Sequence, residues 1–248
     1  MMTDITDHEG PNPLARPPLP KRFYKAVGLG ADGDLHVVQL DGRTARTPGR
    51  SPLGVAERSI AEALAAEWDA QAEHIDPATM PLTRIVNSAI DGVAAKMAET
   101  RADIVAYAGN DLLCYRADSP EELVRRQAEL WDPLLDWADR SLGARLLTGE
   151  GIIPISQPEA AVARFAEALQ PFDPLRLTAL HVATSLTGSA VIPLALAHRE
   201  IEGNAAWDAA HVDEDWQARQ WGEVDEAGAR RRARRRDFDA VVAILRAG

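Results

Sequence analysis

The fold is decided first by the stretch Leu35-His36-Val37-Val38-Gln39-Leu40-Asp41-Gly42-Arg43-Thr44. Its first six residues are rich in valine, and β-branched side chains favour strands. Asp41-Gly42 is the strongest hairpin signal in the chain, because a type I′ turn needs a positive φ at both central positions. We therefore expect a strand at 35–40 and a returning strand at 43–47, which Pro48-Gly49 would end.

The residues on either side extend this unit and then change its character. Upstream, residues 23–27 can form another strand, followed by a turn at 31–34, so a small β meander is expected. Downstream, Ile60, Leu64 and Trp68 recur at helical spacing and predict a helix that ends near residue 71. Further helices are predicted at about 82–91, 96–107, 120–142, 158–169, 173–186, 191–199, 204–220 and 225–246.

Two smaller features complete this assignment. Ser119-Pro120-Glu121-Glu122 predicts a helix start with Ser119 as N-cap and Pro120 at the first helical position. Residues 146–155 are apolar but interrupted by glycine and proline, so they predict either a loop or a short strand.

The predicted order of elements is an α+β fold, with a small β-rich N-terminal domain followed by a larger all-helical domain. Residues 1–20 contain five prolines and are expected to form a disordered or extended arm. Residues 21–85 would form the β-rich domain with one helix, and residues 86–248 the helical domain. A doubly wound sheet is not expected, because the strands do not alternate with helices.

Composition narrows the functional class. The chain has 248 residues and a net charge of −11, the opposite of the usual balance in nucleic-acid-binding proteins. The basic run at 230–236 follows an acidic block, so we interpret both as solvated helix faces that partly neutralise each other, or else as a partner-facing patch. The acidic start resembles neither a signal nor a transit peptide, and no run of about 18 apolar residues appears. A cytoplasmic protein without membrane insertion is expected.

No catalytic or metal-binding constellation stands out. Residues 28–33 match G-x-G-x-x-G, but a valine-rich strand follows instead of a helix, so a glycine-rich hairpin turn is expected rather than a dinucleotide site. The histidines show no metal-ligand spacing, and Cys114 has no second cysteine for a disulfide. We interpret Cys114 as a buried structural thiol. No catalytic residue, metal or cofactor is predicted.

Two stretches place an acid, a tryptophan and a glutamine close together on a helix. In the first, Glu67-Trp68-Asp69-Ala70-Gln71, the indole of Trp68 continues the apolar stripe, while Glu67 and Gln71 are neighbours one turn apart. Trp68 is best interpreted as a core residue that joins the helix to the β unit.

The second stretch, Asp213-Glu214-Asp215-Trp216-Gln217, is followed by Trp221-Gly222. A continuous helix over 204–220 would place Glu214 between two tryptophans on one face, and a buried unpaired carboxylate is costly. Glu214 should therefore either pair with an arginine of the 230–236 run or face a groove or a partner.

The chain resembles the family of assembly chaperones that handle the free α subunit of the F-type ATP synthase. The resemblance rests on the order and spacing of Arg22-Phe23-Tyr24-Lys25, Leu40-Asp41-Gly42-Arg43, Glu67-Trp68-Asp69-Ala70-Gln71, Ile75-Asp76-Pro77, Met80-Pro81-Leu82-Thr83, Ala89-Ile90-Asp91, Asp111-Leu112-Leu113-Cys114-Tyr115-Arg116, Trp131-Asp132-Pro133-Leu134-Leu135 and the stretch from Glu214 to Gly222. A departure is Trp216, where tyrosine or phenylalanine would be expected.

The resemblance implies a bacterial, non-enzymatic chaperone that shields the α subunit until the αβ hexamer forms. The resemblance places the family's functionally sensitive acid at Glu214, with Asp215 as a close second, and its sensitive tryptophan at Trp68. Together with the residue patterns, it leads us to expect partner binding by Glu214, Asp215, Gln217 and Trp221, and a structural or interdomain role for Trp68, Glu67, Gln71 and Asp91. The alternative is a small-molecule enzyme of unknown type with its site between the two domains. Nucleic-acid binding through the arginine run is a third possibility.

Overall fold

The N-terminal domain is built around a short antiparallel sheet. This computed structural model describes residues 18–151, 153–222 and 225–247, so most of the predicted N-terminal arm lies outside the described residues. Strand β1 (Val27–Asp32) pairs with β2 (Leu35–Leu40), which also pairs with β3 (Arg43–Thr44) and β4 (Gly54–Val55). Asp41 and Gly42 have φ values of 49° and 76°, so the predicted hairpin turn is confirmed.

The first strand lies later in the chain than the sequence predicted. Residues 23–26 are not in the sheet, because the N–H groups of Lys25 and Ala26 donate to the carboxylate of Asp41 instead of to a neighbouring strand. Gly28 and Gly30 lie inside β1 rather than in a turn. A Cβ on Gly30 would come within 2.2 Å of Nε2 of Gln39, so glycine here allows the Gln39 side chain to lie across the strand.

Helices make up most of the remaining chain. They are α1 (Arg58–Asp69), α2 (Pro81–Asp91), α3 (Met97–Ala108), α4 (Glu121–Trp137), α5 (Glu159–Ala168), α6 (Pro174–Thr187), α7 (Val191–Ala197), α8 (Gly203–Ala210), α9 (Val212–Trp221) and α10 (Asp225–Arg246). Short 3-10 turns cover Pro77–Thr79, Val93–Ala95 and Leu112–Cys114, and a π turn covers Ala138–Leu142. The short strands β5 (Tyr115–Arg116) and β6 (Gly149–Glu150) pair in parallel. The predicted α+β order is therefore confirmed.

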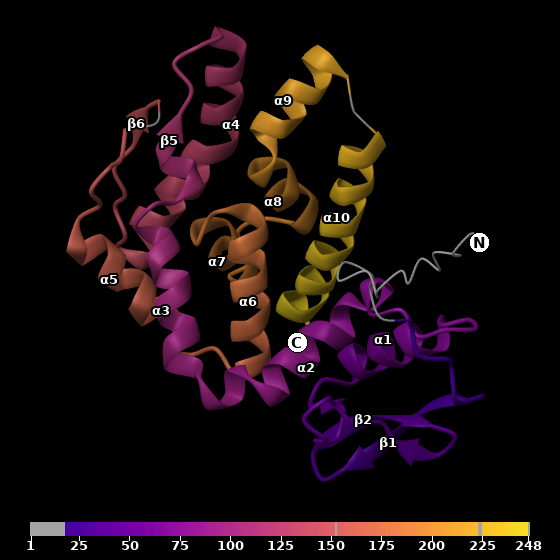
Figure 1. The fold of residues 1–248 in the computed structure, drawn as a ribbon. Coiled ribbons are helices and arrows are strands. Elements are labelled where there is room, and N and C mark those ends of the chain that lie inside the picture. The colour runs from indigo at the N-terminus through magenta and orange to yellow at the C-terminus, as the bar shows by residue number, and fades with distance from the viewer. Residues whose placement is uncertain (1–17, 152, 223–224, 248) are drawn as a thin grey trace, which may run out of the picture.

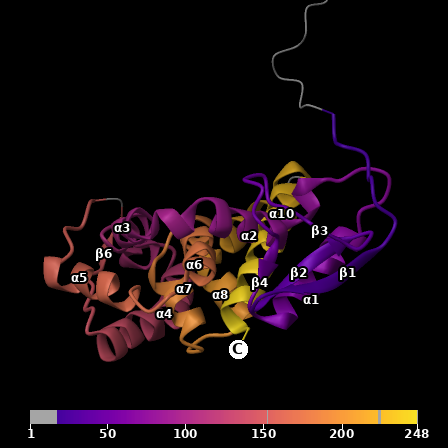
Figure 2. The same cartoon turned by 90° about the horizontal axis from the view of Figure 1, so that it is seen from below.

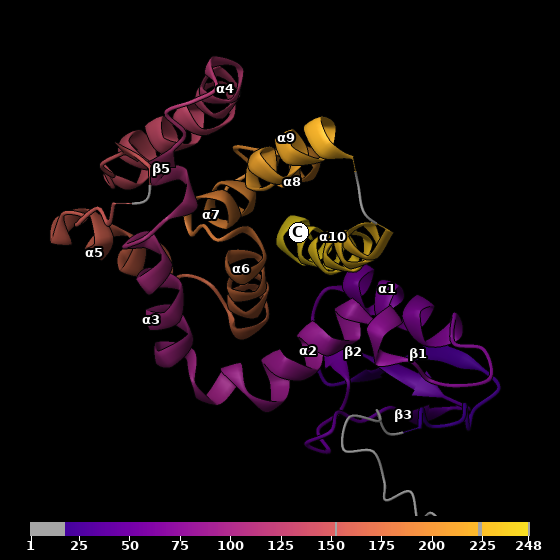
Figure 3. The same cartoon turned by 45° about the horizontal axis from the view of Figure 1, so that its top comes forward.

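The two domains meet along α2 and α10. Helix α1 packs on the sheet, and α2 leads from the β-rich domain into the helical body, where α6 is central (Figure 1). Seen from below, the sheet lies at one end of the molecule and α5 at the other (Figure 2). Helix α10 runs between the β-rich domain and α8 and α9 (Figure 3). An ion pair between Arg84 of α2 and Asp237 of α10 joins the two helices.

Two helix assignments need correction. Helix α4 begins after Pro120, which is itself the N-cap residue, and no side chain caps it; the hydroxyl of Ser119 instead donates to Asp118. The single helix predicted at 204–220 is two helices, α8 and α9, separated at His211. Nδ1 of His211 lies 2.8 Å from the carbonyl oxygen of Trp207, the acceptor that a continuous helix would offer to the backbone N–H of residue 211.

The predicted boundary between residues 85 and 86 falls within α2, a single helix, so the domain limits stay a prediction. In the part of the chain that the structure describes, no helix combines the length and the apolar character that crossing a bilayer requires.

Candidate functional site

Glu67 connects α1 to the first turn of α2. Its two carboxylate oxygens accept the backbone N–H groups of Leu82 and Thr83, with N···O distances of 2.7 and 2.8 Å. These N–H groups have no acceptor within α2, because the first turn of a helix leaves its donors unpaired. Burial raises the pKa of Glu67 above its ordinary value, while the same two hydrogen bonds lower it. Glu67 therefore acts as a side-chain cap from a neighbouring helix.

Gln71 orders the loop that links the same two helices. Its side chain is buried, and its Nε2 donates to the carbonyl oxygen of Glu67 and to Oγ1 of Thr79 at 3.0 and 3.1 Å. Its Oε1 accepts the N–H of Asp76 at 2.8 Å. Both N–H groups of the amide and its oxygen therefore bond within the protein, so Gln71 offers little to a partner.

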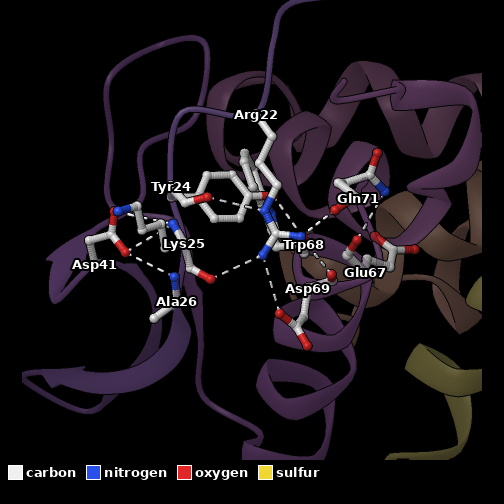
Figure 4. A network of polar contacts seen from close by, with 9 residues as sticks. All are labelled: Arg22, Tyr24, Lys25, Ala26, Asp41, Glu67, Trp68, Asp69 and Gln71. Atoms are coloured by element: carbon white, nitrogen blue, oxygen red, sulfur yellow. Dashed lines mark hydrogen bonds and ion pairs between the residues drawn. The ribbon is translucent and has the colours of Figure 1, made fainter. Parts of the chain in front are cut away.

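Trp68 lies beneath the segment that enters the sheet (Figure 4). The hydroxyl of Tyr24 donates to the carbonyl oxygen of Trp68 at 2.7 Å, and the two rings lie 5.7 Å apart. Arg22 covers the Tyr24 ring and donates to the carbonyl oxygens of Asp69 and Gln71 at the end of α1. Helix C-termini leave such carbonyls unpaired, so Arg22 caps α1.

Asp91 performs a similar function at the other end of α2. Its carboxylate accepts the hydroxyl of Thr47 and the N–H of Gly49, both at 2.7 Å. A Cβ on Gly49 would lie 2.5 Å from Oδ1 of Asp91, so the close approach requires glycine. The structure thus brings Glu67, Trp68, Gln71 and Asp91 to the contacts between α1, α2 and the β-rich domain.

The second stretch lies on α9, beside α10. Glu214 forms an ion pair with Arg234 at 2.9 Å, and Asp215 pairs with Arg231. Arg234 also donates to the carbonyl oxygen of Leu186 at 3.0 Å. Pairing with the arginine run was one of the two alternatives that the sequence left open for Glu214.

These side chains do not share a face with Trp207, contrary to the predicted stripe. Trp207 is 4% exposed in α8, whereas Trp221 is 88% exposed at the end of α9. The break at His211 turns the second helix away from the first, so a single helical stripe does not exist. Glu214 and Trp221 instead line an open groove of about 480 Å³ between α9 and α10, together with Gln217, Ala218, Gly222, Ala227, Arg230, Arg231 and Arg234.

A buried aromatic pair lies at the junction of α8 and α9. The ring of His211 stacks on the ring of Trp207, with centroids 3.8 Å apart. The guanidinium group of Arg235 also lies over the Trp207 ring, 5.3 Å from its centroid. Burial lowers the pKa of His211 below its ordinary value, while the bond to the Trp207 carbonyl and the nearby charge of Glu214 raise it. Burial of His211 at the start of α9 therefore favours the neutral form of its ring.

Sequence reasoning missed the most buried carboxylate. Asp111 is 0% exposed and accepts the N–H groups of Leu113, Ala190 and Val191 at 3.1, 2.7 and 3.1 Å. Burial raises the pKa of Asp111 to about 6. The bond to Leu113 has a local signal, since Asp often accepts the N–H two residues on. Nothing local indicated the two donors near residue 190, about 80 positions away in the chain.

The structure also gives the surroundings of Cys114 and of the acidic clusters. Cys114 is buried, and its burial raises the thiol pKa to about 12, with the charge of Asp111 adding to the effect. Across residues 18–151, 153–222 and 225–247, no group of three His, Cys, Asp or Glu side chains is arranged to hold a metal ion.

Comparison with known proteins identifies the family. The family model for the ATP12 chaperone protein matches residues 21–139. The crystal structure of Atp12 from Paracoccus denitrificans superposes with a TM-score of 0.79 at 41% identity, over 92% of this chain and 96% of that chain. An aspartate-to-lysine mutant of the Paracoccus protein matches with 40% identity and the same TM-score, 0.79, over the same 92% and 96%.

The Atu1473 protein from Agrobacterium tumefaciens is also similar, with a TM-score of 0.87 at 45% identity over 96% of this chain and 92% of that chain. These relatives are bacterial and share the order of sheet and helices described above. The chain therefore belongs to the ATP12 chaperone family.

Proposed function

We propose that this chaperone binds the unassembled α subunit of F-type ATP synthase in the cytoplasm and prevents its aggregation until the αβ hexamer forms. The observation that carries the proposal is Trp221, a large aromatic side chain that is 88% exposed. Tryptophan is enriched among the residues that contribute most to protein interfaces, because it buries a large apolar area at a small entropic cost. Its exposure is most readily explained by a partner that covers it.

The surroundings of Trp221 support the same use. Gln217 and Glu214 are exposed one and two turns earlier on α9, and Arg230 faces them across the groove from α10. An apolar centre with amide and charged groups at its edge is the usual composition of a transient protein interface. We therefore assign partner contact to Glu214, Asp215, Gln217 and Trp221, with the carboxylates also aligned by their arginine pairs.

A non-enzymatic role is part of the proposal. A cleft of about 490 Å³ does lie between the domains, lined mainly by apolar side chains such as Val55, Val86 and Leu175. Its two carboxylates, Glu57 and Asp173, both pair with Arg176, at 3.0 and 2.9 Å. Catalytic clefts usually gather titratable groups with shifted pKa values, and the groups with such shifts here lie elsewhere.

Nucleic-acid binding through the arginine run has less support. Arg230, Arg231, Arg234 and Arg235 each pair with a carboxylate, at Glu226, Asp215, Glu214 and Asp239 respectively. Paired arginines leave less positive charge for phosphates, and the chain as a whole is strongly acidic.

Aggregation of the isolated α subunit tests the proposal. Its light scattering on dilution from denaturant would be followed with the wild-type protein, with Trp221→Ser and with Ile153→Ser. Ile153 is 75% exposed in a loop away from α9 and serves as the matched control. We expect the wild type and Ile153→Ser to suppress scattering equally, and Trp221→Ser to need about tenfold more protein. Equal suppression by both variants, or none by the wild type, would refute the proposal.

A further inference from the structure

A second aromatic side chain, Phe23, is displayed on the opposite part of the molecule. It is 72% exposed, between Arg22 and Tyr24, whose side chains are both occupied with the end of α1. The ring of Phe23 meets that of Tyr24 edge-on at 5.3 Å. Phe23 precedes β1 in the N-terminal domain, whereas Trp221 is the last residue of α9. Figure 1 shows β1 at the bottom of the molecule and α9 at the top.

The backbone around Phe23 is held in place on both sides. The carbonyl oxygen of Pro20 accepts the N–H of Ile75 at 2.8 Å, and the N–H of Arg22 donates to the backbone carbonyl oxygen of Glu73 at 2.9 Å. After Phe23, the N–H groups of Lys25 and Ala26 donate to the carboxylate of Asp41. Holding an exposed ring in one position lowers the entropy lost when a partner binds it.

A cavity of about 440 Å³ opens beside this ring. It lies between the N-terminal segment and the β3 region and is lined by Phe23, Tyr24, Leu40, Asp41, Arg43, Thr44, Ala45, Arg46 and Trp68. The volume is within the range of ligand pockets and is ample for one large side chain. The indole N–H of Trp68 is buried and has no acceptor among the residues that the structure describes. Buried donors are normally paired, so an unpaired one next to a cavity is unusual.

The charged residues that line the cavity are mainly basic, although the protein as a whole carries a net charge of −11. The lining holds Arg43 and Arg46 against one acid, Asp41, while the nearby Arg22 is paired with Asp69 at 3.4 Å. That one acid, Asp41, is already bonded to two backbone N–H groups, and these bonds keep its pKa below its ordinary value. Within the described residues, the side chains of Lys25 and Arg43 form no hydrogen bond or ion pair.

We propose that the cavity beside Phe23 binds an extended acidic segment of a partner protein that carries one aromatic or large aliphatic side chain. That side chain enters against Phe23 and Trp68, and the flanking carboxylates pair with Arg43 and Arg46. Exposed aromatics supply the apolar contact and arginine supplies bidentate contacts to carboxylates. The site is independent of the surface at Trp221, so its test needs no α subunit.

Fluorescence polarisation with three labelled heptapeptides tests this site on the full chain. The first probe has phenylalanine at the centre of six Glu and Asp residues, the second has alanine at the centre, and the third has phenylalanine among six lysines. We expect the first probe to bind about tenfold more tightly than the second, with no measurable binding of the third. Added salt should weaken the binding of the first probe, because the pairing charges are exposed.

Three variants locate the binding. Phe23→Ser and Arg43→Glu should each weaken the first probe about tenfold, whereas Arg145→Glu, the same charge change at an exposed position after α4, should change it less than twofold. All three positions are exposed, so melting temperatures near that of the wild type are expected and verify folding. Loss of affinity in Phe23→Ser and Arg43→Glu but not in Arg145→Glu supports the site.

Two outcomes would overturn the proposal. One is equal binding of the acidic and basic probes, or equal affinity in Phe23→Ser and the wild type. The other is failure of the peptides to bind while vesicles of phosphatidylserine and phosphatidylcholine bind in a manner that depends on Phe23 and Arg43. That second result would assign the surface to anionic lipid instead of protein.

Discussion

The stretches around Trp68 and Trp221 contain the same residue types and differ in almost everything else. Around Trp68, the carboxylate of Glu67 accepts a backbone N–H of α2, and the amide of Gln71 donates to a backbone carbonyl of α1. Asp91 likewise connects the end of α2 to the backbone of Gly49. Around Trp221, the acids pair with arginines at the surface and the indole faces solvent. Local composition thus did not determine which tryptophan is structural; the neighbouring elements did.

The largest effect on stability is expected for Glu67→Ala. The change removes the acceptor of two N–H groups at the start of α2 and should lower the free energy of unfolding by about 2–3 kcal/mol. Urea denaturation at neutral pH measures this. The control is Glu62→Ala on the same helix, whose carboxylate pairs only with Arg58 at the surface and should cost under about 0.5 kcal/mol. Similar losses in both variants would remove the distinction between the two regions.

Gly49→Ala should have the next largest effect. The new methyl group would collide with the carboxylate of Asp91 and loosen the link between α2 and the β-rich domain, at a cost of about 1–2 kcal/mol. Gly28→Ala is the matched control, since a Cβ there has nothing within 4 Å. Thermal melts of the two variants give the comparison. If Gly49→Ala is as stable as Gly28→Ala, the contact with Asp91 is not a restraint.

His211→Asn tests the junction of α8 and α9 through the pH dependence of stability. Because burial lowers the pKa of His211 in the folded protein, the unfolded chain binds the proton more readily. The contribution of His211 to stability is therefore present above about pH 6.5 and is lost as the pH falls below it. The nearby charges are Glu214, Arg231 and Arg234.

The free energy of unfolding is measured for the wild type and for His211→Asn at about pH 7.5 and about pH 5. The change between the two pH values is then compared between the two proteins. The wild type should lose more stability on acidification than the variant, which lacks the titrating ring. Asp111, whose pKa is raised to about 6, contributes with the opposite sign but equally in both proteins. Identical pH profiles would show that His211 does not titrate differently in the folded state.

The smallest effect on stability, with a large effect on binding, is expected for Glu214→Lys. The ion pair with Arg234 is exposed, and such pairs contribute at most about 1 kcal/mol. Binding of the α subunit should weaken about tenfold, as followed by titration calorimetry. The charge-swapped variant Glu214→Lys/Arg234→Glu shows whether the pair or the acid itself matters. A loss of stability as large as that of Glu67→Ala would make Glu214 a structural residue.

Much of the architecture was accessible from local signals. The Asp41-Gly42 turn was predicted because both residues tolerate positive φ. Helix α10 was predicted at the correct limits, although its apolar face, with Phe238, Val241 and Leu245, covers only its second half. The predicted pairing of the arginine run with the acidic block also appears, because the two segments lie on successive helices. The order of motifs was sufficient for the family, and the comparisons confirm it.

Other features depend on contacts between distant residues, which no local pattern encodes. At the break between α8 and α9, the side chain of His211 contacts the carbonyl oxygen of Trp207. Just before the strand that starts at Val27, Asp41 accepts the N–H groups of Lys25 and Ala26. Asp111 finds its donors some 80 residues away. Propensity and periodicity describe one segment at a time, whereas burial and pairing depend on which segments meet. For that reason only the tertiary structure separates the buried polar network at Trp68 from the exposed indole of Trp221.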